Sequence, residues 1–269
     1  MRLSPFALPD RWFAPAPAAK RVAWLGTCAY AHRGLHDQAG AVENSPSAFA
    51  AAIARGLGIE TDIQRSSDGL AMVFHDETLD RLTAETGAVS ARSAAQLGAI
   101  VLSGGHDTIP TLRALLDQIG GQVPLLIEIK SSRGRSAGRQ VHASCLAVRR
   151  VLEGYLGHHA VMSFDPRVAH WFAVHSPLTV RGLVATEEGG LTLARRIKRR
   201  LALWHARPDF LAYDIRDLPS RFAAAQRRRG LALVTWTVNS PEKRERAAAY
   251  ADAPIVEGDG VEAKGVLPA

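Results

Sequence analysis

Four short segments of the sequence place charged residues at the end of, or inside, apolar runs typical of β-strands. They are Ala31-His32-Arg33-Gly34, Glu60-Thr61-Asp62, Phe74-His75-Asp76 and Ile127-Glu128-Ile129-Lys130. Carboxylates in such positions are expected to be buried, which is costly unless they are paired or bind a cation. Carboxylates, imidazoles and cationic side chains together are what a metal-assisted reaction of a phosphate ester requires. The four segments therefore indicate chemistry rather than packing.

Glu60, Asp62 and Glu128 form the predicted metal site. Carboxylate oxygens without cysteine or clustered histidine are typical ligands of Mg²⁺ or Ca²⁺ rather than of zinc. The alternative is structural ion pairing, for example of Glu128 with Lys130 or Arg33. All three carboxylates lie toward the carboxyl ends of predicted strands, where the active sites of barrels are assembled, and this placement favours the metal site.

His32 and His75 are the predicted acid and base, because each ends an apolar strand and an imidazole titrates near neutral pH. One ring would take a proton from the nucleophile and the other would give one to the leaving alkoxide. Arg33 and Lys130 are predicted to bind the phosphate oxygens. Alternatively, the two cationic side chains neutralise the carboxylates, and both roles are compatible.

Two further residues are candidates for the site. Glu43 precedes a helix start at Asn44-Ser45. It is a further metal ligand, a residue that supports the metal ligands, or an acid stabilised by the helix dipole. Trp236, near the end of a predicted strand, either packs against the apolar part of a substrate or belongs to the core. Asp214 similarly either orients substrate hydroxyls or caps a turn.

Composition indicates a globular protein of one large domain. The chain has 269 residues, 47% of them hydrophobic and 22% charged, and barrels of about 250 residues are commonly single domains. Its two cysteines, Cys28 and Cys145, fit a reducing compartment. No apolar run reaches the ~18 residues of a membrane span, and prolines interrupt the N-terminus where a signal peptide would be apolar. We expect a cytoplasmic protein with a Pro/Ala-rich arm over residues 1–20 and a barrel domain over residues 21–269.

The chain is basic, with a formal net charge of +7. Arginine and lysine are concentrated late, in residues 195–200, 227–229 and 243–246. Such runs attract anionic substrates, anionic lipid head groups or nucleic acid, or they are simply solvated helix faces. Aromatic residues are not interleaved with them, so nucleic acid is not an expected partner. The sequence does not indicate an oligomeric state.

Nine segments are predicted as strands, and helix-like stretches separate most of them. They are Cys28–Arg33, Gly58–Ile63, Ala71–His75, Pro124–Lys130, Ala160–Phe164, Val180–Val184, Phe210–Asp214, Leu231–Val238 and Pro254–Glu257. Alternation of strand and helix predicts a parallel sheet covered by helices. The connection Gln64–Leu70 is too short for a parallel crossover, so Ala71–His75 is predicted to return antiparallel as a hairpin. The other eight strands then form an α/β fold, a TIM (β/α)₈ barrel.

The hairpin makes a sharp prediction about register. Asp68-Gly69 is a favoured two-residue turn, which would pair Ser67 with Leu70 and place Asp62 directly opposite His75. Residues 76–122 are long for one connection, and we expect them to form an insertion above the barrel mouth that helps to shape the pocket.

The ordered set of motifs resembles the glycerophosphodiester phosphodiesterase family, which shares its barrel with phosphatidylinositol-specific phospholipase C. The matching pieces run through residues 29–240 and are His32-Arg33-Gly34, Glu43-Asn44-Ser45, Glu60-Thr61-Asp62, Ser67-Asp68-Gly69, Val73-Phe74-His75-Asp76-Glu77-Thr78-Leu79-Asp80-Arg81, Ile127-Glu128-Ile129-Lys130, Ser163-Phe164 and Trp236-Thr237-Val238-Asn239. The chain departs from the family where the last strand ends, with Ile255-Val256-Glu257-Gly258-Asp259 in place of a Thr-Asp-x-Pro-like segment.

The resemblance implies a TIM barrel with an insertion after the His75 segment. It also implies a divalent cation, Mg²⁺ or Ca²⁺, on Glu60, Asp62 and Glu128, and acid/base roles for His32 and His75. The implied reaction is hydrolysis of glycerophosphodiesters to glycerol 3-phosphate and an alcohol. Two alternatives are weighed against it: cleavage of lysophospholipids as by a phospholipase D, and a non-enzymatic barrel that binds anionic lipid or nucleic acid. The lysophospholipid alternative involves contact with an anionic membrane through the basic helices and through apolar groups such as Trp171 and Phe172, expected to be exposed.

Overall fold

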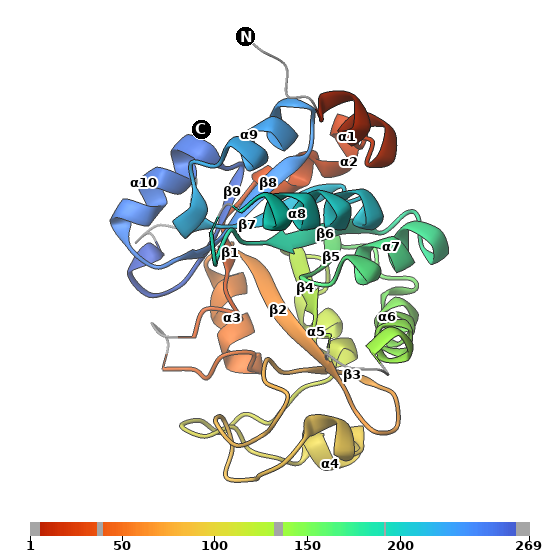
Figure 1. Ribbon diagram of the computed structural model, residues 1–269. Helices are drawn as coiled ribbons and strands as arrows, with labels where there is room; N and C mark the ends of the chain where they lie inside the picture. The colour runs from red at the N-terminus through yellow and green to blue at the C-terminus, as the bar shows by residue number, and fades with distance from the viewer. Residues whose placement is uncertain (1–5, 37–39, 132–136, 191, 262–269) are drawn as a thin grey trace.

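The computed structural model describes residues 6–36, 40–131, 137–190 and 192–261. Eight parallel strands form the barrel: β1 (Tyr30–Ala31), β2 (Gly58–Arg65), β4 (Leu125–Ile129), β5 (His159–Ser163), β6 (Val180–Ala185), β7 (Phe210–Asp214), β8 (Ala232–Val238) and β9 (Ala253–Val256). Strands β4 to β9 are neighbours in chain order, and β1 pairs with both β9 and β2, which closes the barrel. The predicted TIM barrel is therefore confirmed (Figure 1).

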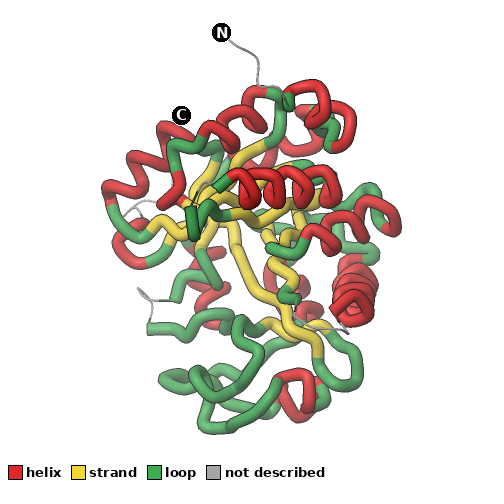
Figure 2. The backbone as a smooth tube through the Cα atoms, in the orientation of Figure 1, coloured by secondary structure: helices red, strands yellow, loops and turns green. Residues whose placement is uncertain are grey.

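Helices surround the barrel (Figure 2). They are α3 (Pro46–Ala54), α5 (Leu112–Ile119), α6 (Ala137–Leu152), α7 (Pro166–His175), α8 (Leu193–Ala206), α9 (Arg221–Arg228) and α10 (Pro241–Tyr250), with single 3₁₀ turns at η3 (Ile215–Asp217) and η4 (Gly258–Gly260). Three begin with a side-chain cap followed by proline, with Ser45, Asp165 and Ser240 as the caps, an arrangement that favours a helix start. None of the described helices is long and apolar enough to cross a membrane.

Alternation of side chains along the barrel strands points the carboxylates inward. Glu60 is in register with Leu126, and Asp62 with Glu128, and Leu126 belongs to the core inside the barrel. Ile59, in contrast, belongs to the core between the strands and the helices. Since successive side chains of a strand face opposite sides, all three predicted metal ligands project into the barrel.

The third strand, β3 (Ala71–Val73), runs antiparallel to β2 as predicted, but in a different register. Ile63 pairs with Val73, and the amide of Phe74 donates to the carbonyl of Asp62 at 3.0 Å. The prediction that Asp62 lies directly opposite His75 is therefore wrong by one residue. His75 follows the end of β3, so its backbone is not held by the ladder.

The shift in register arises in the hairpin loop, which has three residues rather than two. Ser66 and Leu70 close the loop through a backbone hydrogen bond of 3.0 Å. The Ser66 hydroxyl accepts from the Leu70 amide at 2.9 Å and donates to Asp68 at 2.6 Å. Gly69 has φ +90°, a conformation that glycine adopts without strain. These side-chain bonds favour the longer loop over a two-residue turn.

The connection after β3 forms its own small core. It contains the 3₁₀ turn η2 (Val89–Ala91) and the helix α4 (Ala94–Gly98). Its apolar residues up to Ile109 pack with Met72 and Phe74 of the hairpin. Helix α5, which ends the same connection, instead packs in the main core between the strands and the helices.

The N-terminal segment is helical and contacts the barrel helices. It contains α1 (Ala7–Phe13), α2 (Ala19–Val22) and the 3₁₀ turn η1 (Ala23–Gly26). Asp10 is buried and accepts hydrogen bonds from Arg200, Trp204 and Gln226. The division into an arm of residues 1–20 and a domain of residues 21–269 stays a prediction, with this contact joining the two parts.

Two residues expected on the surface are buried. Trp171 is 8% exposed and Phe172 is fully buried, because both lie on the face of α7 that packs in the main core. The prediction that they are exposed apolar groups is therefore wrong.

Candidate active site

The three predicted metal ligands lie together inside the barrel mouth. Glu60, Asp62 and Glu128 are buried, and one oxygen of each lies within 4.8 Å of the others. Burial, followed by the charge of Asp62, raises the pKa of Glu60 to about 8. Burial also raises the pKa of Glu128. Carboxylates that disfavour one another's ionised form in this way fit a divalent cation, which would hold all three deprotonated.

Lys130 and Arg33 extend their cationic groups into the same cluster. The Lys130 ammonium lies 2.7 Å from an oxygen of Asp62 and 2.7 Å from one of Glu128. Arg33 Nε lies 3.2 Å from Asp62. Burial alone would raise the pKa of Asp62, but these two cations lower it far below its usual range. Asp62 therefore stays ionised in this cluster.

Backbone conformation places Arg33. Its φ of 53° ends β1 after Ala31, so the strand is shorter than predicted. In this conformation the Arg33 amide donates to Glu60 at 3.2 Å, while its guanidinium donates to Glu43 at 2.8 Å. One residue thus contacts both a predicted metal ligand and the predicted supporting acid.

Each predicted acid/base histidine is bonded to a carboxylate of its own. His32 Nδ1 lies 2.6 Å from an oxygen of Glu257, and its Nε2 lies 4.0 Å from Glu60. Burial would lower the pKa of His32, but the hydrogen bond to Glu257 and the charge of Glu60 outweigh it and raise this pKa. Glu257 thus orients the ring and favours its charged form. Glu257 and His32 also have ligating atoms close to His36.

The pKa of His75 is shifted in the opposite direction to that of His32. Its Nδ1 lies 2.6 Å from Asp76, but burial lowers the pKa of His75, and the positive charges of Lys130 and Arg33 add to that effect. Asp76 itself has a pKa of about 2, mainly because Arg81 donates hydrogen bonds to it. The surroundings therefore shift the pKa values of the two imidazoles in opposite directions.

Arg81 joins the two ends of the site. Its guanidinium donates to both oxygens of Glu43, at 2.7 and 3.1 Å, and to both oxygens of Asp76, at 2.6 and 3.0 Å. Glu43 also accepts from Arg33, and Asp76 holds His75. A continuous chain of charged hydrogen bonds therefore links Arg33 to His75 through one arginine of the insertion.

A buried amide orients the central carboxylate. Asn44 donates to Asp62 at 3.0 Å and accepts from the Thr61 hydroxyl at 2.7 Å. Its φ of 57° lies in the left-handed region that asparagine tolerates better than most residues. Glu43 thus bonds two arginines, and its neighbour Asn44 fixes Asp62.

One cavity contains the predicted metal ligands, histidines and cations. It is lined by His32, Arg33, Glu60, Asp62, His75, Glu128, Lys130, Met162, Phe164, Val184, Trp236, Thr237 and Ile255. Trp236 meets Phe164 edge to face at 5.5 Å and donates to the carbonyl of Ala212 at 3.0 Å, so it forms a fixed apolar wall. Residues 76–122 are all described, and none of them lines the cavity. Asp214 caps η3 and pairs with Arg216, and it is not among the lining residues either.

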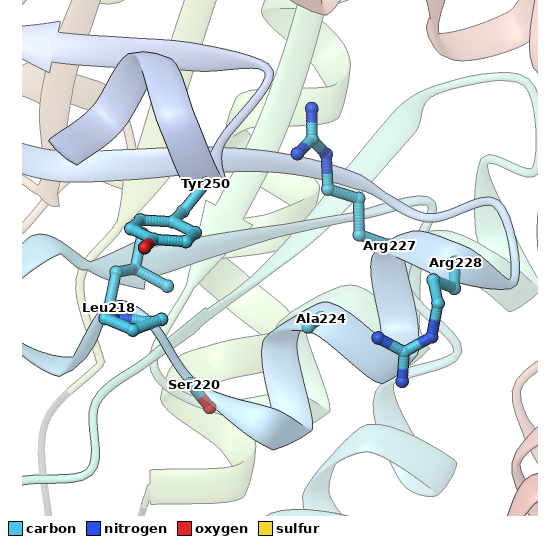
Figure 3. A pocket seen from close by; sticks show the side chains of 7 residues that line it. Leu218, Ser220, Ala224, Arg227, Arg228 and Tyr250 are labelled. Atoms are coloured by element: carbon cyan, nitrogen blue, oxygen red, sulfur yellow. The ribbon is translucent and has the colours of Figure 1, made fainter. Parts of the chain in front are cut away.

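A second pocket lies near α9 and α10 and differs in chemistry. Leu218, Pro219, Ser220, Ala224, Arg227, Arg228 and Tyr250 line it (Figure 3). Its lining has no carboxylate and no histidine, and Arg227 is paired with Asp252. It lacks the groups for acid/base or metal-assisted chemistry, so the barrel mouth is the candidate active site.

Sequence reasoning did not assign a role to three residues that orient the site: Glu257, Asp76 and Arg81. Asp76 and Arg81 belong to the quoted motif of residues 73–81, and Asp76 directly follows His75. The motif was therefore the available signal for these two residues. Glu257 is 225 residues from His32, and no local pattern connects them.

The mouth of this TIM barrel holds clustered carboxylates, two imidazoles bonded to carboxylates, an arginine and a lysine. Such a site is suited to cleaving a phosphodiester. The sequence matches the glycerophosphoryl diester phosphodiesterase family over residues 32–258, and the chain belongs to that family.

Individual relatives agree with this assignment. The chain is 39% identical over 115 residues to a glycerophosphodiester phosphodiesterase of Caldanaerobacter subterraneus and 31% identical over 133 residues to human glycerophosphodiester phosphodiesterase 1. These alignments cover 40% and 44% of this chain, and 46% and 39% of the relatives, less than half of each. The fold is similar to that of an Oleispira antarctica phosphodiesterase solved with the product sn-glycerol 3-phosphate, with a TM-score of 0.72, 21% identity and coverage of 85% and 92% of the two chains.

Proposed function

We propose that this chain hydrolyses glycerophosphodiesters to glycerol 3-phosphate and an alcohol, using a divalent cation, Mg²⁺ or Ca²⁺. The observation that carries the proposal is the buried trio Glu60, Asp62 and Glu128 beside two imidazoles that are each bonded to a carboxylate. Membership of the family supports the reaction class, and the product in the Oleispira antarctica structure supports the substrate class.

The side chains of the cavity divide the work of binding. Glu60, Asp62 and Glu128 would hold the cation, which when bound supplies positive charge to the phosphoryl oxygens. Arg33 and Lys130 bind the remaining phosphate oxygens and stabilise negative charge as the reaction proceeds. Trp236 packs against the apolar part of the substrate, and Glu43 fixes the guanidinium of Arg33.

Two proton transfers accompany hydrolysis, and the two histidines carry them. One imidazole takes a proton from the nucleophile, either water or the neighbouring glycerol hydroxyl, as its oxygen bonds to phosphorus. The other gives a proton to the alkoxide oxygen as its bond to phosphorus breaks. Where the hydroxyl attacks, the first product is a cyclic phosphodiester, and water then opens that ring in a second step to give glycerol 3-phosphate, with the acid and base roles of the two imidazoles exchanged. Glu257 and Asp76 each bond one Nδ1, which leaves the other nitrogen of each ring for proton transfer.

Release of glycerol 3-phosphate from glycerophosphocholine tests the proposal. We expect release with Mg²⁺ or Ca²⁺ and none with a chelator. His32→Ala and His75→Ala should each lower kcat at least ~10²-fold, as is typical of a lost general acid or base. His106→Ala, which removes an exposed histidine of the insertion, is the matched control. Near-normal turnover of either active-site variant would remove that residue from the mechanism, and no release with either cation would contradict the proposal.

A second candidate is hydrolysis of lysophospholipids at an anionic membrane. The observation that favours it is the exposure of Leu193, Ile197 and Leu201 on the basic helix α8. Hydrolysis of lysophosphatidylcholine in vesicles but not of glycerophosphocholine would favour it over the first candidate.

The cysteines Cys28 and Cys145 are both free, which supports a cytoplasmic location. Nucleic acid is not an expected partner.

A further inference from the structure

Helix α8 carries an apolar stripe on its outer face. Leu193, Ile197 and Leu201 are spaced by four residues, so they lie along one side of the helix, and they are 70%, 46% and 55% exposed. The opposite side, which includes Leu203 and Ala206, is buried in the main core. Helix α8 lies across the front of the barrel in Figure 2. A solvated helix face would not need large apolar side chains at three successive turns.

Basic residues flank the stripe on both sides. Helical geometry places Arg196 and Lys198 about 100° to either side of Ile197, and both are exposed. Residues 193–206 include no aspartate or glutamate. Arg199 and Arg200 turn inward and are neutralised by Glu187 and Asp10. The exposed charge that helix α8 itself places beside the stripe is therefore positive.

Helix α1 packs beside the last turns of α8 and adds exposed apolar side chains of its own. The rings of Phe13 and Trp204 lie 5.3 Å apart, and Asp10 fixes α1 through hydrogen bonds to Arg200 and Trp204. Two residues of this short helix, Leu8 and Trp12, are 78% and 82% exposed. Figure 1 shows α1 close to one end of α8. We call Leu8, Trp12, Phe13, Leu193, Ile197 and Leu201, together with Arg196 and Lys198, the α1–α8 surface.

We propose that the α1–α8 surface binds the face of an anionic lipid bilayer. Apolar side chains in a stripe with basic residues on both flanks are the pattern of helices that lie in the membrane interface. The apolar groups would enter the acyl boundary while Arg196 and Lys198 meet lipid phosphates. A second copy of this chain would bring the same positive flanks together, so charge favours the lipid. The contact does not depend on the proposed hydrolysis, because none of these residues lines the catalytic cavity.

Co-sedimentation with vesicles tests this proposal on the full chain. We expect binding to phosphatidylcholine vesicles that contain one third phosphatidylglycerol, loss of that binding in high salt, and little binding to pure phosphatidylcholine. Replacing both Ile197 and Leu201 by Ser should weaken binding at least about tenfold. Each apolar side chain that becomes buried in the bilayer is expected to strengthen binding by about tenfold or more. Leu156→Ser is the matched control, since Leu156 is 98% exposed but lies two helices away, between α6 and β5.

The charged flanks are tested in the same way. Arg196→Gln with Lys198→Gln should weaken binding to the anionic vesicles, whereas Arg149→Gln with Arg150→Gln, on the exposed end of α6, should not. Trp12 emission should shift to the blue on binding, and a Trp12→Phe variant should lose the shift.

Three outcomes would overturn the proposal. The first is no binding to anionic vesicles. The second is equal loss of binding in the Leu156→Ser control. The third is light scattering that gives a dimer for the wild type and a monomer for the Ile197/Leu201 variant, which would assign the surface to a second copy. Release of glycerol 3-phosphate from soluble glycerophosphocholine should be unchanged in all these variants, so failure of this proposal is distinguishable from failure of the proposed function.

Discussion

Replacement of Arg81 tests whether the insertion acts on catalysis without lining the cavity. Arg81 donates four hydrogen bonds, two to Glu43 and two to Asp76. In an Arg81→Ala variant, Glu43 keeps Arg33 and Asp76 keeps His75, but neither acid is held in place on its other side. We therefore treat Arg81 as a positioning residue.

The expected magnitude follows from the exposure of these bonds. A hydrogen bond to a charged group contributes ~1.5–3 kcal/mol when buried, and the Arg81 side chain is 48% exposed, so solvent weakens each carboxylate contact to roughly 1 kcal/mol. Loss of both gives about 2 kcal/mol, which corresponds to a decrease in kcat/KM of about 30-fold. Arg81→Lys should recover only part of this, because an ammonium keeps the charge but not the planar fork that bonds two carboxylates at once.

The assay is the pH dependence of glycerol 3-phosphate release, measured for both variants and for the control Arg92→Gln. Arg92 lies in the same insertion and pairs with Glu85 at 2.8 Å. Because Arg81 holds the pKa of Asp76 at about 2, its removal should let that pKa rise, so activity should fall at a higher pH on the acidic side. A kcat/KM and acidic limb equal to those of the wild type would refute the role given to Arg81.

Three further predictions concern separate parts of the molecule. Glu257→Gln should lower the pKa of His32, since the hydrogen bond that raises this pKa would then come from a neutral amide instead of a carboxylate. An unchanged titration of the His32 imidazole, measured by NMR in the metal-free protein, would contradict this prediction. Mg²⁺ affinity should rise as pH increases through about 8, because cation binding must displace the proton that Glu60 retains below that pH. Calorimetry in buffers of different ionisation enthalpy would detect the released proton. An Mg²⁺ affinity that does not change with pH would argue against Glu60 as a ligand. Asp10→Ala should lower the free energy of unfolding by about 3 kcal/mol, because it leaves the Arg200 guanidinium without its buried partner. Urea denaturation measures this free energy, and Asp117→Ala, at an exposed position, is the control. Equal stability of the two variants would contradict the prediction.

The inner position of the carboxylates could be predicted from the sequence, because it depends on local rules. Alternation along a strand fixes that Glu60 and Asp62 share a face. Parallel pairing brings the carboxyl ends of neighbouring strands to one edge, and Glu128 is in register with Asp62 as this requires.

Features that depend on particular side-chain contacts could not be predicted. The hairpin register depends on the hydroxyl of Ser66, whose hydrogen bonds favour a three-residue loop over the two-residue Asp68-Gly69 turn. The buried face of α7 is set by the neighbours it packs against, so Trp171 was wrongly expected at the surface. The carboxylate partner of His32 is supplied by Glu257, far along the chain, and spacing alone does not indicate such a pair.

The closure of the barrel through β1 has a consequence for the order of events during synthesis. His32 follows β1, and its partner Glu257 follows β9, 225 residues later. At ~5–20 residues per second, Glu257 leaves the ribosome roughly 10–45 s after His32. Until then β1 lacks one of its two neighbours, and the proposed proton-transfer site has only one of its two carboxylate–imidazole pairs. The proposed active site is therefore completed only when β9, the last strand of the barrel, pairs with β1, the first.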